Sequence, residues 1–156
     1  MDTLIKLQQY FERNNVPYEV ILHEEVYTAQ ELAQALHTPG SELVKVVIVK
    51  ADGAFRMSVL PASRRIDLEA LKKFWNAGAV VIANEQEFKN LFPEAELGAM
   101  PPFGNLYNIE VWVDTSLTTD DHITFNAGTH YKAVRMLYRD FERLVRPRVA
   151  CFSVHL

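Results

Sequence analysis

LVKVVIVKADGAFRMSVL, from Leu43 to Leu60, contains the strongest fold signal in the sequence. Two largely apolar runs, the first rich in valine, flank the pair Asp52-Gly53. An Asp-Gly pair between apolar runs is a strong signal for a two-residue hairpin turn. The stretch therefore predicts two antiparallel strands joined by a tight turn, with apolar residues on both faces of the first strand.

Helices and strands are predicted to alternate around this hairpin. Capping residues and apolar spacing indicate helices at residues 3–14, 28–36, 67–74, 84–92 and 138–145. Further strands are expected at residues 18–22, 79–83, 106–114 and 122–128 and at the C-terminus, the second of them buried. Hairpins mixed with helices indicate an α+β (mixed α/β) fold, with one domain over residues 1–156 and a curved, mostly antiparallel sheet. The G-x-G-x-x-G and Walker patterns of nucleotide-binding domains are absent from the sequence.

Composition narrows the class of protein. The chain has 156 residues, 49% of them hydrophobic and 23% charged, which is typical of a globular domain. No apolar run reaches the length of a membrane span, and the charged N-terminal segment does not resemble a signal peptide. The single cysteine, Cys151, excludes an internal disulfide and favours a reducing, cytoplasmic setting. Its apolar context, VACFSV, predicts a buried thiol.

The net charge of −4 argues against a broad surface for binding DNA. A local exception is the run RMLYRDFERLVRPR, in which Arg135, Arg139, Arg143 and Arg146 recur at helical spacing. Acidic residues lie among these arginines, so a solvated helix face is the favoured interpretation. A stripe that contacts RNA phosphates is the alternative.

Lys45 stands out within the first strand of the hairpin. Side chains alternate between the two faces of a strand, so Lys45 shares a face with Leu43, Val47 and Val49. A lysine on an apolar face must reach water, pair with an acid or line a cavity. It is therefore either a lysine at the sheet rim or a pocket cation that meets an anionic or carbonyl ligand.

The segment ELGAMPPFGN, from Glu96 to Asn105, combines two glycines with a Pro-Pro pair. Proline fixes φ and lacks an N–H, which excludes a helix or a central strand here. The residues alone leave two interpretations open, a rigid connector and a loop that binds a ligand.

No familiar metal or triad pattern is present. The five histidines lack the spacing of metal ligands, so neither a metal nor another cofactor is expected; they are His23, His37, His122, His130 and His155. The G-x-S-x-G elbow is also absent, which disfavours a Ser-His-Asp hydrolase.

Taken in order, these stretches resemble the YbaK and prolyl-tRNA synthetase-associated editing domains. VKVVIVK is similar to the lysine-bearing strand of that family, and SVLPASRRIDLEALKK to its strand, proline and following helix. GAMPPFG matches the G-x-x-x-P loop, with Gly98 and Pro102 in the motif positions. VWVDTSL and ITFNAGTH resemble the closing strands.

The resemblance implies a YbaK-like fold and a cytoplasmic aminoacyl-tRNA deacylase that acts in trans on the ester of a mischarged tRNA. The implied catalytic residues are Lys45, Gly98 and Pro102. The implied substrate-binding residues are Thr28, Met100, Phe103, Asn126, Gly128 and His130. Thr28 also fits a helix N-cap, which explains it without a ligand.

The resemblance also suggests what the glycine-proline loop does. Backbone N–H groups from Gly98, Ala99, Met100 or Phe103 would stabilise the oxyanion of ester hydrolysis. The implied partner is the aminoacylated 3′ end of tRNA, with an aminoacyl-tRNA synthetase as a candidate second partner and no membrane or DNA. Two alternatives remain open, a tRNA- or nucleotide-binding module without turnover and an esterase for small molecules.

Overall fold

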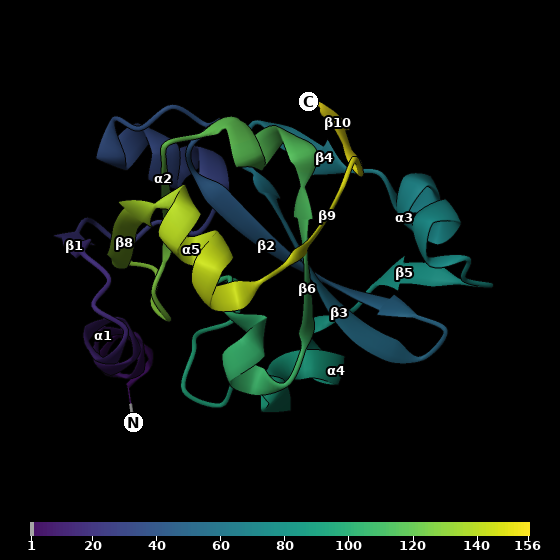
Figure 1. Ribbon diagram of the computed structural model, residues 1–156, viewed down its shortest axis with the longest axis horizontal. Coiled ribbons are helices and arrows are strands. Elements are labelled where there is room, and N and C mark those ends of the chain that lie inside the picture. The colour runs from purple at the N-terminus through teal and green to yellow at the C-terminus, as the bar shows by residue number, and fades with distance from the viewer. Residues whose placement is uncertain (1) are drawn as a thin grey trace.

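The computed structural model describes residues 2–156 and has an α+β architecture (Figure 1). Its strands form sheets in the orders β5-β2-β3-β6-β9, β1-β8-β7 and β4-β10. They are β1 (Tyr18–Leu22), β2 (Val44–Ala51), β3 (Ala54–Pro61), β4 (Arg64–Ile66), β5 (Val80–Ile82), β6 (Glu110–Asp114), β7 (His122–Asn126), β8 (Lys132–Leu137), β9 (Arg148–Ala150) and β10 (Ser153–His155). The α-helices are α1 (Thr3–Arg13), α2 (Ala29–Leu36), α3 (Leu68–Trp75), α4 (Glu85–Phe88) and α5 (Tyr138–Val145).

The hairpin predicted from the sequence is confirmed. β2 and β3 pair antiparallel over their full lengths, with Lys45 opposite Leu60. Asp52 and Gly53 form the turn with φ of 48° and 87°. Positive φ at both central residues is what a type I′ turn requires, and its twist matches that of the strands it joins.

The five-stranded sheet is mixed. β2 pairs antiparallel with β3 and β5, whereas β6 pairs parallel with β3 and with β9. Parallel neighbours need a long crossover connection. Residues 62–109 supply it between β3 and β6, and they contain α3, β5, α4 and the glycine-proline segment. A backbone bridge from Leu43 to Thr124 joins this sheet to the three-stranded one.

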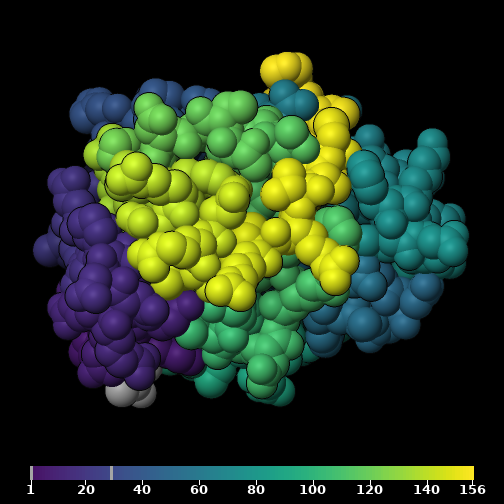
Figure 2. Space-filling view, in the orientation of Figure 1, coloured from purple at the N-terminus to yellow at the C-terminus, as the bar shows by residue number. Residues whose placement is uncertain are grey.

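The largest hydrophobic core is contributed by both of these sheets and by α1 and α5. At its centre stands Phe103, whose ring centroid lies 5.4–5.5 Å from those of Phe11, Phe125 and Phe141. α1 and α5 lie side by side over this core, as Figure 2 shows on the face that it presents. The hydroxyl of Tyr10 donates a hydrogen bond of 3.4 Å to the carbonyl of Leu144 between the two helices.

The predicted helix starts are confirmed at their caps. Thr28 and Glu31 form a capping box at α2, and Asn84 and Glu87 form one at α4. Asp67 accepts hydrogen bonds from two backbone N–H groups at the start of α3. These side chains satisfy donors that the first turn of a helix leaves free.

Two expectations about burial are wrong. β5 is an edge strand that pairs only with β2 among the described strands, so Val81 and Ile82 remain 51% and 53% exposed. Cys151 is exposed rather than buried, because it lies in the break between β9 and β10 and not inside one strand.

Two expectations about element boundaries also change. Residues 104–107 form a 3₁₀ helix, and Asn108 then takes φ of 57°, so the strand predicted from residue 106 begins at Glu110. Arg135 lies on β8, and Arg146 follows the end of α5 with φ of 51°. The four arginines therefore do not share one helix, and only Arg139 and Arg143 project from α5.

Candidate functional site

Lys45 lines a cavity of about 180 Å³ at the start of β2. It forms no ion pair with any of residues 2–156. Burial removes water from its ammonium group and lowers the pKa of Lys45 below that of an ordinary lysine. The cavity therefore has an unpaired cation in its wall.

Four segments that are distant in sequence enclose this cavity. It is lined by Tyr27, Thr28, Leu32, Val44, Lys45, Val46, Gly98, Met100 and Asn126. Among the residues predicted from the sequence, the structure brings together Thr28, Lys45, Gly98, Met100 and Asn126. Its wall combines apolar side chains with the polar groups of Thr28, Lys45 and Asn126, and such converging polar groups are typical of a site for a small ligand.

Backbone geometry makes the Gly98 loop, residues 93–100, a source of hydrogen-bond donors. Gly98 has φ of 84°, which turns the chain at the cavity wall at low steric cost. The N–H of Ala99 is already donated to the carbonyl of Glu96 at 3.0 Å. Among the described residues, the N–H groups of Gly98 and Met100 have no acceptor, so these two are the donors that remain beside the cavity.

The other predicted site residues lie behind the loop and outside the cavity wall. Phe103 is fully buried in the core. Pro102 is buried next to it. The N–H of Gly128 donates to the carbonyl of Ala99 at 2.9 Å. His130 is buried, and its Nε2 donates to the carbonyl of Leu97 at 2.9 Å. Gly128 and His130 thus bind the loop by hydrogen bonds, and Pro102 and Phe103 anchor the chain that follows it in the core.

Two polar side chains in the cavity wall have unused hydrogen-bonding capacity. The Oγ1 of Thr28 accepts from the N–H of Glu31 at 3.1 Å, which leaves its hydroxyl proton free to donate. The Oδ1 of Asn126 is buried and has no partner among residues 2–156. A buried amide oxygen without a partner is costly, so a bound donor would be favoured at Asn126.

A larger hollow of about 620 Å³ adjoins the first and shares Val46, Gly98 and Met100 with it. Its other walls come from β2, from Ile82 on β5 and from α4 and its N-cap. The Gly98 loop therefore borders both hollows.

Sequence reasoning missed four residues of the cavity wall, Tyr27, Leu32, Val44 and Val46. Tyr27 is exposed, and its ring centroid lies 4.9 Å from that of His130. Leu32 comes from the apolar face of α2, and Val46 neighbours Lys45 on β2. A helix with a capping residue next to an aromatic is the only local signal that could have pointed to Tyr27, and it is weak.

In the described part of the chain, no group of three or more His, Cys, Asp or Glu side chains is placed to hold a metal ion. None of the helices over residues 2–156 has both the length and the apolarity needed to cross a membrane.

Comparison with known sequences points to one family. The sequence model of a family described as "Aminoacyl-tRNA editing domain" matches residues 23–144. The proline–tRNA ligase of Staphylococcus haemolyticus is 32% identical over 120 residues, which are 75% of this chain and 21% of the ligase. That of Staphylococcus saprophyticus is 31% identical over 123 residues, with the same coverage. The chain thus spans about a fifth of the length of these curated relatives.

Comparison with solved structures supports the fold. A hypothetical protein aligns with a TM-score of 0.86 at 22% identity, over 96% of this chain and 99% of that one. A candidate trans-editing enzyme for prolyl-tRNA synthetase aligns with a TM-score of 0.83 at 18% identity, over 99% and 98% of the two chains. At these identities the likeness concerns the fold.

Proposed function

The chain belongs to the aminoacyl-tRNA editing domain family, and we propose that it hydrolyses, in trans, the ester of a mischarged tRNA. The ester is the bond between the amino acid and the 3′-terminal adenosine. One observation carries the proposal: Lys45, which has no ion-pair partner among residues 2–156, lines the same cavity as Gly98 and Met100, whose N–H groups have no acceptor there. A cation and fixed donors together suit a substrate whose carbonyl oxygen becomes negative.

The proposed mechanism needs no protein nucleophile, because an aminoacyl ester is already reactive. A water molecule attacks the ester carbon, and negative charge develops on the carbonyl oxygen. Gly98 and Met100 donate hydrogen bonds to this oxygen without reorganising, since the loop is already fixed. The bond to the ribose oxygen then breaks, and that oxygen takes up a proton derived from the water. Lys45 orients the substrate and stabilises the negative charge, and it does not act as the base.

The two hollows suggest how the substrate is divided. The 180 Å³ cavity has room for about six waters at roughly 30 Å³ each, which suits a small aminoacyl group and not a nucleoside. The 620 Å³ hollow then takes the terminal nucleotide. Thr28 and Asn126 contact the substrate, whereas Pro102, Phe103, Gly128 and His130 act by holding the loop.

The deciding experiment is release of amino acid from a panel of mischarged tRNAs, with correctly charged tRNAs as controls. Turnover of at least one mischarged tRNA supports the deacylase. Binding without turnover favours the tRNA- or nucleotide-binding module, and activity confined to small esters favours an esterase. The match to proline–tRNA ligases makes mischarged tRNA for proline the first substrate to test, and a synthetase the first protein partner.

Replacing Gly98 with alanine is expected to slow single-turnover deacylation by about tenfold, with only about 1 kcal/mol lost from the free energy of unfolding. The added Cβ meets only His130, at 3.5 Å, so the cost comes from the positive φ. The loop can relieve that strain only by moving its N–H groups away from the ester.

The matched control for this variant is Gly53→Ala. Gly53 has a similar φ of 87° and no atom within 4 Å of an added Cβ, but it lies in the distant hairpin turn. It should lose similar stability and keep its rate. Equal rates for the two folded variants would mean that the loop is only a connector.

Neutralising Arg135, Arg139 and Arg143 with glutamine is expected to weaken tRNA binding and to lower its salt dependence. The expected drop in the slope of log K against log salt is about two, because each phosphate contact contributes roughly 0.7–0.9. Arg139 is exposed and Arg143 is 55% exposed, whereas Arg135 is half-buried on β8. The control is the double variant Lys72→Gln/Lys73→Gln on α3. If the slope of the arginine variant is unchanged and equals that of the control, the arginines form a solvated face and do not contact tRNA.

A further inference from the structure

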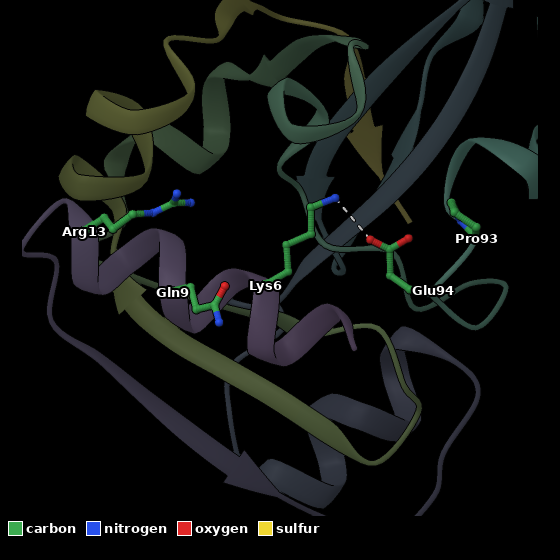
Figure 3. Close-up of a pocket in the computed structure, with 5 residues that line it drawn as sticks. All are labelled: Lys6, Gln9, Arg13, Pro93 and Glu94. Atoms are coloured by element: carbon green, nitrogen blue, oxygen red, sulfur yellow. Dashed lines mark hydrogen bonds and ion pairs between the residues drawn. The ribbon is translucent and has the colours of Figure 1, made fainter. Parts of the chain in front are cut away.

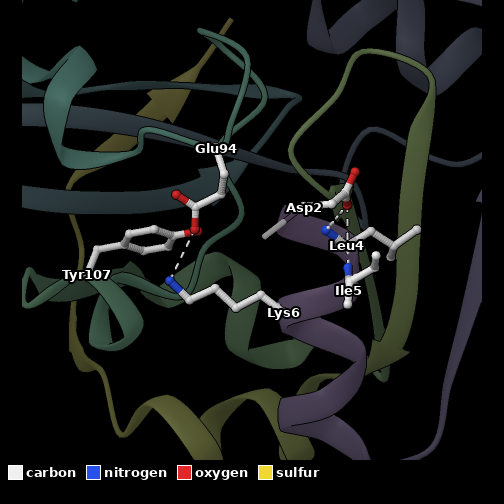
Figure 4. A network of polar contacts seen from close by, with 6 residues as sticks. All are labelled: Asp2, Leu4, Ile5, Lys6, Glu94 and Tyr107. Carbon is white, nitrogen blue, oxygen red and sulfur yellow. Dashed lines mark hydrogen bonds and ion pairs between the residues drawn. The ribbon is translucent and has the colours of Figure 1, made fainter.

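The N-terminal helix α1 reaches the Gly98 loop through one polar cluster. The ammonium of Lys6 lies 3.1 Å from the carboxylate of Glu94, to which the hydroxyl of Tyr107 also donates at 3.3 Å (Figure 4). The same ammonium lies 4.2 Å from the centre of the Tyr107 ring. Phe92 also packs on Tyr107, with its ring centroid 4.7 Å from that of Tyr107.

The first residue of α1 makes a second contact with the support of the loop. Thr3 is buried, and a Cβ placed on Gly128 would lie 2.3 Å from the Cβ of Thr3. Gly128 in turn binds the loop through two backbone hydrogen bonds. Its carbonyl accepts from Glu96 at 2.8 Å, and its N–H donates to Ala99 at 2.9 Å.

These contacts surround the part of the loop that borders the cavity. Glu94 is held by α1, and Glu96 and Ala99 are held by Gly128. Gly98 lies between these anchors and has φ of 84°, so a shift at either side would turn its N–H. α1 lies outside residues 23–144, so the family match assigns it no role.

The pair between Lys6 and Glu94 sits in the wall of an open groove of about 590 Å³ along α1 (Figure 3). Lys6 remains 33% exposed there and Glu94 18% exposed. The pair is partly buried, so its loss can lower global stability as well as loosen the loop. Amides distant from the loop, such as those of β2 and β3, distinguish the two effects.

We propose that Lys6 is a positioning residue, which fixes the Gly98 loop through Glu94 so that the N–H groups of Gly98 and Met100 face the ester. The catalytic part of this inference rests on the proposed function. Lys6 does not touch the cavity, so it acts on the rate of the chemical step and not on substrate affinity. The structural part, that Lys6 keeps the Gly98 loop ordered, does not depend on whether the protein turns over a substrate.

The first test is amide hydrogen exchange of full-length protein, which needs no substrate. Lys6→Met should speed exchange at the Glu96 and Ala99 amides by about tenfold, while the β2–β3 amides stay protected. The matched control is Arg56→Met. Arg56 pairs with Glu110 and lies 4.5 Å from the Trp75 ring. Lys6 likewise pairs with an acid and lies over an aromatic ring, but neither partner of Arg56 belongs to the Gly98 loop. Equal exchange in the two variants would overturn the proposal.

The second test is single-turnover deacylation at saturating and half-saturating tRNA. Lys6→Met should lower the rate constant about tenfold with a half-saturating concentration within twofold of wild type, and Lys6→Arg should restore it, since arginine can pair with Glu94 and stack on Tyr107. Unchanged rates, or no rescue by arginine, would contradict the positioning role. If the wild-type protein releases no amino acid, the proposed function fails. The exchange experiment then still tests whether Lys6 orders the Gly98 loop.

Discussion

Lys45→Ala is expected to slow single-turnover deacylation of a mischarged tRNA by about 10²- to 10³-fold, the size of effect seen when one fixed oxyanion donor is removed. The variant should remain folded. Lys45 has no ion-pair partner among residues 2–156, so no opposite charge is stranded by the change. The measurement pairs a melting curve with a chemical-quench time course.

Two further variants separate charge from shape. Lys45→Met keeps an apolar stem but removes the charge, so it should lose as much activity as Lys45→Ala. Lys45→Arg should not restore full activity, because a planar guanidinium does not replace a compact ammonium in a cavity of about 180 Å³. Full activity in the alanine variant would contradict the proposed role of Lys45 in deacylation. So would activity lost only through unfolding, which would make Lys45 a structural residue.

The lowered pKa of Lys45 also predicts whether replacing this residue raises or lowers the stability of the protein. The pKa in the folded state lies below that in the unfolded state, so the charged side chain opposes folding at neutral pH. That opposition fades as pH rises through the folded-state pKa towards the ordinary lysine value. Lys45→Met should therefore melt slightly higher than wild type at pH 7, and the difference should shrink in alkaline buffer.

Gly128→Ala is expected to give the largest loss of stability, about 3 kcal/mol of unfolding free energy, or roughly 10 °C in Tm. Gly128 has φ of 94°, which is strained for alanine, and the new Cβ would lie 2.3 Å from the Cβ of Thr3. Neither backbone can move freely, because Gly128 binds the loop and Thr3 begins α1. Thermal or urea unfolding measures the loss.

The comparison variant for Gly128→Ala is again Gly53→Ala, which carries the positive φ without the clash. It should cost only about 1 kcal/mol. The double variant Thr3→Gly/Gly128→Ala removes the opposing Cβ and should be less destabilised than the two single changes added together. Strict additivity would show that the contact with Thr3 is not the cause.

Much of the fold could be predicted because its signals are local. Asp52-Gly53 specifies its own turn, and Thr28 with Glu31 specifies its own helix start, through contacts within a few residues. The burial of β5 could not be predicted, because its apolar composition is the same whether a strand is central or at an edge. Cys151 was misplaced for a similar reason: an apolar run does not reveal that the chain breaks between two strands.

The candidate site divides in the same way. The sequence singled out Lys45 as an unusual charge and Gly98 as a hinge, since each departs from its immediate surroundings. It did not separate the cavity residues Thr28 and Asn126 from Phe103, Gly128 and His130, which stand behind the loop. Nor did it indicate Tyr27 or the contact of Lys6 with Glu94.

Local signals were thus enough to predict the hairpin, the capped helices, the stiff glycine-proline segment and the unusual lysine. The enclosure of one cavity by α2, β2, the Gly98 loop and the end of β7 became evident only from the folded chain. The same is true of the contacts of α1 with Glu94 and Gly128. Turns and caps depend on neighbours in sequence, whereas a cavity and its unpaired groups exist only after distant strands have paired and excluded water.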